Sequence, residues 1–555
     1  RLMELNKYFR TTIILVISIL ILSSCSQNKG MYSDEGQVFR KVIPQDMTTL
    51  DTAMITDSVS NDIAEQAFEG LFSLDKNDKA TLAIAKNMPK KSKDGKTLIF
   101  DLKENAKWSN GDDVTANDFV YAWRKVVNPK TGSEYAYIMT DIKNADDINA
   151  GKKPVESLGI KAINKHKLEI QLNRPIPYIN ELLTLSTFYP QNEKISKKYG
   201  EKYGTKVEKT VFNGPFKVDK WKHEDKILLS KNNNYWDKKN VKLEKVNYKV
   251  LKDKQVGASL YETGSIDDTL ITADQVNKYK DSPALKKRIT SGNFYIKLNQ
   301  KKVKEFSNKN LRLAIARSIN KQGYVDAVKN DGSSPSNTLT AKGVAKVEGD
   351  KDYTSTINSP LDFNPKLANE NWQKAKKELK IEKFTFTMNT EDTPDAKISA
   401  EYIKSQVEKN LPGITLKIKQ LPFKQRIALE TKMNYEASLS GWGADYSDPT
   451  SYLGTMTKDN PQNNTGWNNT SFDNSYNEVN GKLLKYIDKR NETMKNMEEL
   501  LVSDAPIAPI YQKGEAHLTN PQVKGLIYHV VGPDTTLKNV YIDKSVDRNT
   551  GKKKN

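Results

Sequence analysis

The chain has 555 residues, with 88 lysines and arginines against 69 aspartates and glutamates, which gives a formal net charge of +19. With 37% hydrophobic residues, 25 tyrosines, 16 phenylalanines and 7 tryptophans, it is too apolar and too aromatic for a disordered chain. At about 150 residues per domain, this length predicts two to four domains. The single cysteine excludes an internal disulfide and any multi-cysteine metal site. The four histidines show no H-x-H or HExxH spacing, so we expect neither a metal nor another cofactor.

The N-terminal segment has the pattern of a secretory signal. Lys7 and Arg10 precede a largely apolar run of ten residues, 13–22, which is shorter than the roughly 20 residues that span a bilayer but typical of a signal peptide. The run ends in Leu-Ser-Ser-Cys, which resembles the bacterial lipobox, in which the cysteine is lipidated and becomes the new N-terminus. We therefore expect a lipoprotein signal peptide over residues 1–24, a lipid anchor at Cys25 and a polar tether over residues 25–37. A plain secretory signal with a chance cysteine is the alternative.

The predicted anchor places the protein on the extracytoplasmic face of the cell membrane. The composition, rich in lysine and asparagine, favours a Gram-positive source with a low-GC genome. The lysines are spread along the whole chain among acidic residues, without a basic stripe or a nucleic-acid-binding motif. We therefore expect a solvated lysine surface near an anionic membrane and no nucleic-acid partner.

Strands and helices alternate along the chain, which predicts a mixed α/β class. Leu98, Phe100 and Leu102 alternate in a predicted strand over residues 97–102. Thr115 is the expected N-cap of the next helix, with Asp118 at its third position, and an Asn-Pro pair ends this helix. The remaining predicted elements are strands over residues 168–172 and 414–418 and a helix over residues 395–410.

Two segments are expected to lack regular structure. Residues 330–352 are rich in glycine, serine and lysine, which predicts a long surface loop. Residues 544–555, which end in Gly-Lys-Lys-Lys-Asn, are predicted to form a disordered tail.

Sequence motifs of catalysis are absent. The sequence contains no GxSxG elbow, no phosphate-binding GxxxxGK[ST] loop and no GxGxxG fingerprint. The one cysteine is assigned to the anchor, so it cannot serve as a nucleophile. We therefore do not expect an enzyme, although a hydrolase with two catalytic carboxylates leaves no such motif and stays open.

Three segments together resemble one protein family. They are residues 97–137, with the stretch KWSNGDDVTANDFVYAWR, residues 144–172, and residues 440–456, SGWGADYSDPTSYLGTM. These segments are similar to the family-5 solute-binding proteins of ABC importers, in the oligopeptide-binding branch. The similarity runs from about residue 38 to residue 543.

The resemblance implies a fold and a function. The fold is mixed α/β (α+β), a two-lobed clamshell of the periplasmic-binding-protein type II, cluster C, with an extra third domain. Lobe I would comprise residues 38–68, 195–297 and 512–543, the extra domain residues 69–194, and lobe II residues 298–511. The function would be that of a monomeric extracytoplasmic protein, without a cofactor, that captures oligopeptides and delivers them to the membrane subunits of an ABC permease.

The third segment carries residues to which the resemblance assigns ligand contacts. Asp445 takes the position that binds the N-terminal ammonium of the peptide. Gly441 and Gly443 would let the ligand backbone approach closely, and Trp442 between them would form part of the pocket wall. A loop or cap role for the aspartate, a simple turn for the glycines and a core role for the tryptophan are the alternatives.

The opposite wall of the cleft is also implied by the resemblance. Thr56 and Ser58 match positions that contact the peptide through main-chain atoms, and Tyr135 matches a tyrosine that lines the cleft. Weaker matches, which fit a core or surface role equally well, are Phe423, Tyr295 and Thr465.

The sequence departs from the family pattern where the carboxylate of the peptide is held. An arginine and a histidine that often bind it are replaced by Leu439 and by the Pro-Asp pair at residues 394–395, and a pocket tyrosine is replaced by Leu270. We therefore expect longer peptides whose C-terminus leaves the pocket, or a carboxylate held by Lys432. A binder of nickel or another metal chelate and a peptide-pheromone binder remain alternatives, and an enzyme or chaperone-like module is a third.

Overall fold

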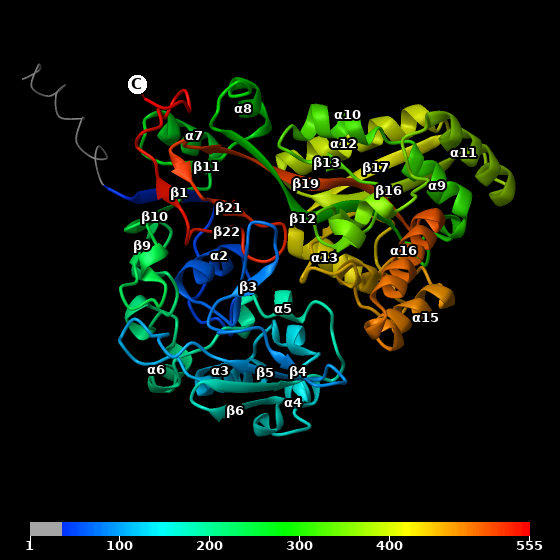
Figure 1. The fold of residues 1–555 in the computed structure, drawn as a ribbon. Helices are drawn as coiled ribbons and strands as arrows, with labels where there is room; N and C mark the ends of the chain where they lie inside the picture. Colours follow the sequence, from blue (N-terminus) through cyan, green and yellow to red (C-terminus); the bar gives the residue numbers. More distant parts are fainter. Residues whose placement is uncertain (1–35, 555) are drawn as a thin grey trace, which may run out of the picture.

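The computed structural model describes residues 36–554, so the predicted signal peptide, Cys25 and most of the predicted tether lie outside the described residues. Two long antiparallel strands, β12 (Leu285–Leu298) and β19 (Ile507–Thr519), form the centre of an 11-stranded sheet. At about 3.3 Å per residue each strand spans roughly 45 Å. In Figure 1 they run from the body at the upper left into the body on the right. The two lobes of the molecule are therefore joined by paired strands, and the predicted mixed α/β, two-lobed class is confirmed.

The sheet has the strand order β17-β16-β18-β12-β19-β11-β1-β10-β9-β8, and β13 (Ser334–Pro335) pairs with β19. The half that contains β1 forms the first lobe. Its strands are β1 (Val38–Ile43), β8 (Phe216–Lys222), β9 (Lys226–Lys231), β10 (Lys245–Val250) and β11 (Asp268–Leu270). Its helices are α2 (Ser58–Ala67), α6 (Glu193–Tyr199), α7 (Lys254–Glu262) and α8 (Ala273–Lys278). Strand β1 runs parallel to both β10 and β11, so both of its edges are paired, and it is buried almost throughout.

The other half of the sheet forms the second lobe. Its strands are β16 (Phe384–Glu391), β17 (Ile414–Leu421) and β18 (Ala437–Trp442). Its helices are α9 (Lys309–Arg317), α10 (Lys321–Tyr324), α11 (Pro365–Leu379), α12 (Pro394–Asn410), α13 (Phe423–Thr431), α14 (Thr450–Leu453), α15 (Thr470–Val479) and α16 (Ile487–Asp504). The helix predicted over residues 395–410 and the strand predicted over residues 414–418 are confirmed as α12 and β17. Ala400, Ile403 and Val407 lie on one face of α12 and are fully buried.

A third body, at the bottom of Figure 1, contains a four-stranded sheet and helix α3 (Ala116–Val127). The strands are β4 (Lys90–Lys91), β5 (Thr97–Asp101), β7 (Lys167–Gln171) and β6 (Ile160–Asn164), and the shorter elements are β2 (Phe72–Leu74), β3 (Ala80–Leu82), α4 (Ala145–Asn149) and α5 (Ile179–Leu182). The predicted strand and helix are confirmed, because Leu98 and Phe100 are buried and Thr115 and Asp118 form the expected capping box. One continuous hydrophobic cluster joins this body to the first lobe. The residue numbers at which we divide the chain into lobes and extra domain stay a prediction.

Residues 330–352 and 544–554 contain little regular structure, as expected, but the predicted surface position of the first segment and the predicted disorder of the second were wrong. In the predicted surface loop, Leu339 and Thr340 are fully buried, and their backbone N–H groups both donate to Glu498 Oε1 at 2.8 Å. The predicted tail is ordered over the described residues 544–554, because Arg548 donates to the carbonyl oxygens of Tyr261 at 2.9 Å and Ile266 at 2.6 Å. In both segments a partner distant in sequence supplies the order.

Short strand pairs complete the described chain. They are β14 (Lys346–Val347) with β15 (Lys351–Asp352), β20 (Val523–Lys524) with β23 (Tyr541–Ile542), and β21 (Ile527–Tyr528) with β22 (Thr535–Thr536). Over residues 36–554, no helix combines the length and the apolar character that crossing a membrane requires.

Candidate functional site

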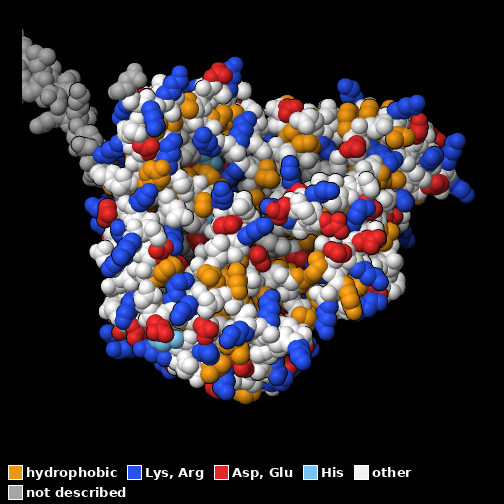
Figure 2. Space-filling model, viewed as in Figure 1, with side chains coloured by type: hydrophobic (Ala, Val, Ile, Leu, Met, Phe, Trp, Pro, Cys, Tyr) orange, Lys and Arg blue, Asp and Glu red, His pale blue; other side chains and the backbone are white. Residues whose placement is uncertain are grey.

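A groove between the lobes is built from three cavities of about 520, 510 and 210 Å³. The two larger cavities share five lining residues, which are Ser58, Phe294, Lys513, Glu515 and Asp534. The smallest cavity shares Ser58, Tyr135 and Asp445 with the second. The three cavities are therefore parts of one continuous groove, and Figure 2 shows this hollow near the centre of the face, among acidic and basic side chains.

Asp445 lies where the smallest cavity adjoins the second one, on the loop that follows β18. Its side chain is partly buried, and the Tyr137 hydroxyl donates to its Oδ1 at 3.5 Å. Among the described residues no lysine, arginine or histidine forms an ion pair with this carboxylate. Burial raises the pKa of Asp445 to about 6, because the ionised form loses water without gaining a cation. A carboxylate in this state can bind a cationic group of a ligand strongly.

The loop that carries Asp445 is fixed by its own hydrogen bonds. The Asp445 N–H donates to Ser451 Oγ at 2.9 Å. Asp448, three residues after Asp445, accepts hydrogen bonds from Arg490 on both of its carboxylate oxygens, at 2.8 and 3.0 Å. Both side chains of this ion pair are buried. A bidentate, buried pair holds a loop in one geometry. The Asp445 carboxylate is thus presented to the groove by a rigid support.

Strand β18 forms one wall of the groove and has a free edge. One edge pairs antiparallel with β12 over residues 437–442. The other edge pairs with β16 only at Ala437 and Ser438, so no described strand pairs with it over residues 439–442. The unpaired backbone N–H and C=O groups of such an edge are the groups that an extended peptide can pair with.

The glycines of this wall have different roles. A Cβ at Gly441 would lie 2.9 Å from two ring atoms of Phe294, so the glycine makes room for a neighbouring side chain of the protein. At Gly443 the only close neighbour would be Ser291 Oγ at 3.3 Å, so space remains on the groove side. Trp442 lines the cavity of about 510 Å³ together with both glycines, and its Nε1 donates to the Ser451 carbonyl at 2.8 Å.

The opposite wall brings the other predicted residues together. Thr56, Ser58 and Tyr135 line the smallest cavity together with Asp445. Ser58 begins α2, whose N-cap Asp57 accepts a hydrogen bond from the Ser60 N–H at 2.7 Å. The exposed side chains of Thr56 and Ser58 therefore lie beside a helix N-terminus that faces the groove.

Three weaker matches do not line these cavities. Tyr295 is buried in the core of the second lobe. Thr465 is fully buried and hydrogen-bonds Asn463 at 2.9 Å in a loop. Phe423 begins α13 and is 58% exposed. We therefore remove these three residues from the candidate site.

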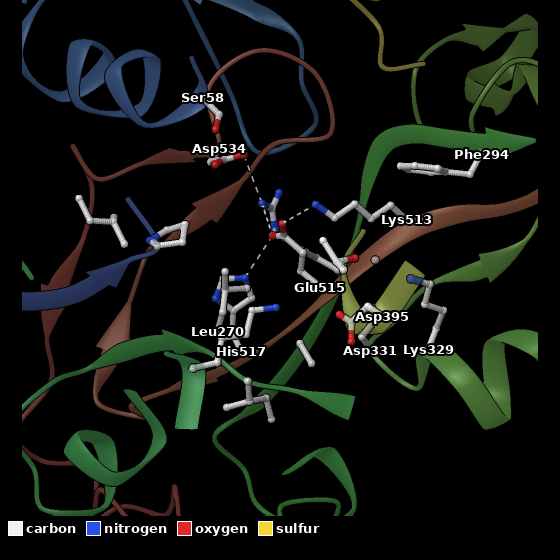
Figure 3. Close-up of a pocket in the computed structure, with 18 of the residues that line it drawn as sticks. Ser58, Leu270, Phe294, Lys329, Asp331, Asp395, Lys513, Glu515, His517 and Asp534 are labelled. Atoms are coloured by element: carbon white, nitrogen blue, oxygen red, sulfur yellow. Dashed lines mark hydrogen bonds and ion pairs between the residues drawn. The ribbon is translucent and has the colours of Figure 1, made fainter. Parts of the chain in front are cut away.

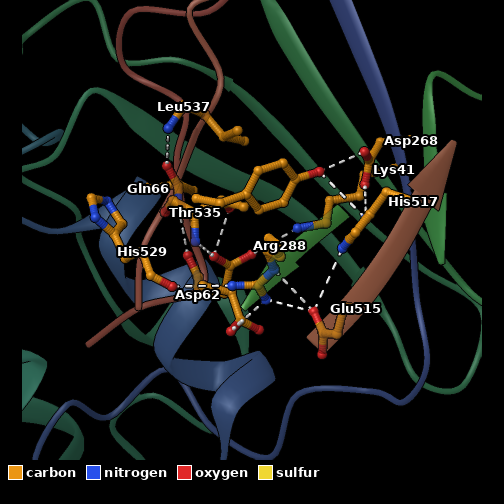
Figure 4. Close-up of polar contacts among 12 residues, drawn as sticks. Lys41, Asp62, Gln66, Asp268, Arg288, Glu515, His517, His529, Thr535 and Leu537 are labelled. Atoms are coloured by element: carbon orange, nitrogen blue, oxygen red, sulfur yellow. Dashed lines mark hydrogen bonds and ion pairs between the residues drawn. The ribbon is translucent and has the colours of Figure 1, made fainter. Parts of the chain in front are cut away.

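The largest cavity contains a network of paired charges that sequence reasoning missed (Figure 4). Arg288 forms ion pairs with Glu515 at 2.6 Å and Asp534 at 3.3 Å. His517 Nδ1 lies 3.2 Å from an oxygen of Asp268, and the negative charges of Asp268 and Glu515 raise the pKa of this buried histidine although burial opposes it. Glu515 and His517 share β19, but Arg288, Asp268 and Asp534 come from three other segments, so no sequence motif connects the network. Their mutual neutralisation leaves the cavity wall polar without a strong net charge.

The largest cavity, shown in Figure 3, is lined by positions that depart from the family pattern. Leu270, Leu439 and Asp395 all line it. Lys329 also lines it and lies over the Tyr511 ring, 4.8 Å from the ring centroid. Lys329 forms no ion pair within the described residues, and burial lowers its pKa, while the negative charges of Asp331 and Asp395 oppose this shift. Lys432, the expected substitute for the missing arginine, is exposed at the end of α13 and does not line these cavities.

The chain is similar to known proteins in sequence and in fold. The family model of the bacterial extracellular solute-binding proteins, family 5 (Middle), matches residues 79–464. A dipeptide-binding protein of Lactococcus lactis subsp. cremoris is 34% identical over 97% of this chain and 100% of its own. The substrate-binding domain of an oligopeptide ABC transporter from Bacillus anthracis has a TM-score of 0.77 at 39% identity, over 92% of this chain and 99% of its own. Peptide-bound OppA of Listeria monocytogenes has a TM-score of 0.76 at 38% identity, over 92% of this chain and 100% of its own.

The chain belongs to the family-5 bacterial extracellular solute-binding proteins, as the match over most of its length shows. It is therefore a binding protein of the kind that serves ABC importers and not an enzyme. In the described residues no group of three or more His, Cys, Asp or Glu is placed to hold a metal ion.

Proposed function

We propose that this protein is the extracytoplasmic peptide-binding lipoprotein of an ABC importer. It binds an extended oligopeptide in the groove, with the N-terminal ammonium on Asp445, and delivers it to the permease. The observation that carries this proposal is a partly buried carboxylate without a described cationic partner, at the point where two cavities of the groove adjoin. The relatives are named as dipeptide- and oligopeptide-binding proteins, which supports the same ligand class.

Backbone recognition follows from the free edge of β18. A transporter that accepts many sequences has to bind the groups that all peptides share. Residues 439–442 offer unpaired N–H and C=O groups, and Gly443 leaves space beside them. An extended peptide can add to this edge as a further strand, which provides affinity without reading side chains.

The C-terminal carboxylate of the peptide forms an ion pair with the ammonium group of Lys329. This ammonium group lines the largest cavity and forms no ion pair in the described chain, although the charges of Asp331 and Asp395, which line the same cavity, partly offset the effect of burial. A carboxylate beside it would restore the charged form of the lysine, which burial disfavours. Lys329 therefore takes the role that the sequence comparison could not assign.

The membrane anchor and the delivery step rest on the sequence. Cys25 follows a signal-like apolar run, but it lies outside the described residues. Two or more acyl chains on this cysteine would hold the protein stably on the membrane surface, where the permease is located. Metabolic labelling with a radioactive fatty acid tests the anchor, because Cys25→Ser should abolish the label.

Calorimetric titration tests the ligand. The chain from residue 26, which retains every described residue, is titrated with a mixed-sequence hexapeptide and with its N-acetylated twin. We expect the free-amine peptide to bind, and Asp445→Asn to weaken it by about 3 kcal/mol or more, roughly a hundredfold, because an unpaired charge is left behind. The acetylated peptide should show a similar loss.

The matched control is Asp459→Asn, which changes an exposed aspartate outside the groove and should leave binding unchanged. If neither peptide binds the parent protein while a nickel chelate does, the peptide proposal is wrong and the metal-chelate alternative replaces it.

A further inference from the structure

Two aromatic rings meet across the cleft beside Asp445. Tyr178, which directly precedes α5 in the third body, stacks on Tyr446 of the second lobe, with ring centroids 4.5 Å apart and planes inclined by 8°. Tyr178 is only 5% exposed. Tyr446 packs against the hydrophobic cluster shared by the third body and the first lobe, although it belongs to the second lobe. The second lobe therefore contributes the Tyr446 side chain to the hydrophobic contacts on the opposite side of the cleft.

A second contact lies on the same side of the cleft. Arg174 Nη1 donates to the Asn480 carbonyl at 2.8 Å, while its Nε donates to Asp141 Oδ1 at 2.6 Å. Asn480 is the C-cap of α15, where unpaired carbonyl groups accept hydrogen bonds readily. The Arg174 guanidinium thus forms an ion pair with an aspartate of the third body and a hydrogen bond with the C-terminal end of a helix in the second lobe.

The position of Tyr446 relative to Asp445 links these contacts to the ligand. The two residues are adjacent in one short loop. This loop is held by the Asp445 N–H to Ser451 Oγ bond and by the buried Asp448–Arg490 pair. When the second lobe carries Tyr446 away from Tyr178, it therefore also carries the Asp445 carboxylate away from the opposite wall, which Thr56, Ser58 and Tyr135 form.

We infer that the Tyr178–Tyr446 stack and the Arg174–Asn480 hydrogen bond form a clasp that closes the second lobe onto the third body and positions Asp445 against the ligand. The inference rests on the proposed function for its ligand and extends it to two positioning residues, Tyr178 and Tyr446. Closure draws part of its free energy from these protein contacts, so the closed form is populated before a peptide arrives. A ligand that binds only the closed form then binds more tightly in proportion to that population.

The clasp is tested first without any ligand. Because Cys25 is the only cysteine, a chain from residue 26 with Lys152→Cys and Lys489→Cys, both exposed, carries one fluorophore on each side of the cleft. We expect Tyr446→Ala and Tyr178→Ala to shift the energy-transfer distribution towards longer distances, and Tyr178→Phe, which keeps the stacked ring, to leave it unchanged. Unchanged distributions in both alanine variants would overturn the clasp, whatever the ligand is.

Peptide release is the second readout. Stopped-flow dissociation of a fluorescent hexapeptide should be about tenfold faster in either alanine variant, while the double variant should be no faster than the single variants, because both remove the same interaction. A double variant about a hundredfold faster would show that the two rings act independently and would contradict the clasp. If no peptide binds the parent protein, the proposed function fails while the ligand-free distances still decide the clasp.

The control uses another contact across the cleft. Lys79 and Asp350 form an ion pair at 3.2 Å, but both side chains are more than half exposed. Such pairs contribute little, so Lys79→Ala should change neither distance nor release rate by more than about twofold. Circular dichroism shows whether Tyr178→Ala folds. If it does not, the distances and release rates of Tyr446→Ala, which removes a partly exposed ring, and of Arg174→Gln test the clasp instead.

Discussion

Asp445 has an electrostatic environment that a ligand completes. Its carboxylate is partly buried, and its one hydrogen bond to a described side chain, from the Tyr137 hydroxyl, is 3.5 Å long. Burial holds its pKa at about 6, above the ordinary value of an aspartate. A proton and a peptide ammonium therefore compete for the same charge, since either one neutralises it.

This competition predicts a pH dependence of binding. The carboxylate must be ionised to bind the ammonium, so we expect the dissociation constant to rise about tenfold for each unit of pH below 6. Affinity should reach a plateau near pH 7 and weaken again above about pH 8, where the peptide's own amino group loses its proton. Titrations between pH 5 and pH 9 measure the profile. Residual binding to Asp445→Asn should show no midpoint near 6, and the same flatness in the parent protein would contradict the assignment.

Part of the site could be predicted residue by residue. Asp445, Thr56, Ser58 and Tyr135 line one cavity as expected, because the family resemblance assigned each of them to a ligand-contacting position. Tyr295 shows where this fails. It follows Phe294 on β12, and successive side chains of a strand point to opposite faces. The phenylalanine therefore faces the groove and the tyrosine the core, a distinction that a weak match cannot make.

At the scale of elements, the packing of β18 on β12 depends on one glycine. Gly441 lies opposite Phe294 in the register, and a Cβ there would sit 2.9 Å from two atoms of the ring. We expect Gly441→Ala to lower the free energy of unfolding by about 1–3 kcal/mol, because the ring has to move out of a packed position. Urea denaturation measures this difference.

The comparison variant is Gly443→Ala, whose Cβ would meet only Ser291 Oγ at 3.3 Å. Its effect on stability should stay below about 1 kcal/mol. Equal losses in the two variants would show that backbone conformation, and not the Phe294 ring, requires the glycines.

Elements with local signals were predictable and those with distant partners were not. The capping box of α3 and the alternation of β5 are written within a few residues, and both were confirmed. The paired strands β12 and β19 are separated by more than two hundred residues, and β12 begins with a charged stretch that does not alternate. The segment 330–352 was mistaken for a surface loop because Glu498, which binds its backbone, comes from a distant helix.

At the scale of the molecule, the groove predicts the length of the ligand. Between Leu439 and Asp445 an extended chain covers at most about 20 Å, which corresponds to roughly six residues of a peptide. We expect affinity in a series of alanine-based peptides to rise up to five or six residues and then to fall, because a longer extended peptide cannot keep its ammonium on Asp445 and its carboxylate beside Lys329 at the same time. Calorimetry on peptides of two to eight residues measures this series, and a maximum at two or three residues would contradict the extended mode.

The paired strands that join the lobes also determine how the molecule can move. The ladder between β12 and β19 is interrupted by register shifts between Ile289 and Asn293 and between Phe294 and Tyr295, beside the groove. A bulge bends and twists a two-stranded ribbon locally while the hydrogen bonds on either side keep it stiff. The lobes can therefore bend towards and away from each other at the bulges, whereas two flexible linkers would also let them rotate freely relative to each other. Because this motion is restricted, the lobes gain little orientational entropy when the cleft opens. Weak contacts at the rim of the cleft are then enough to favour closure.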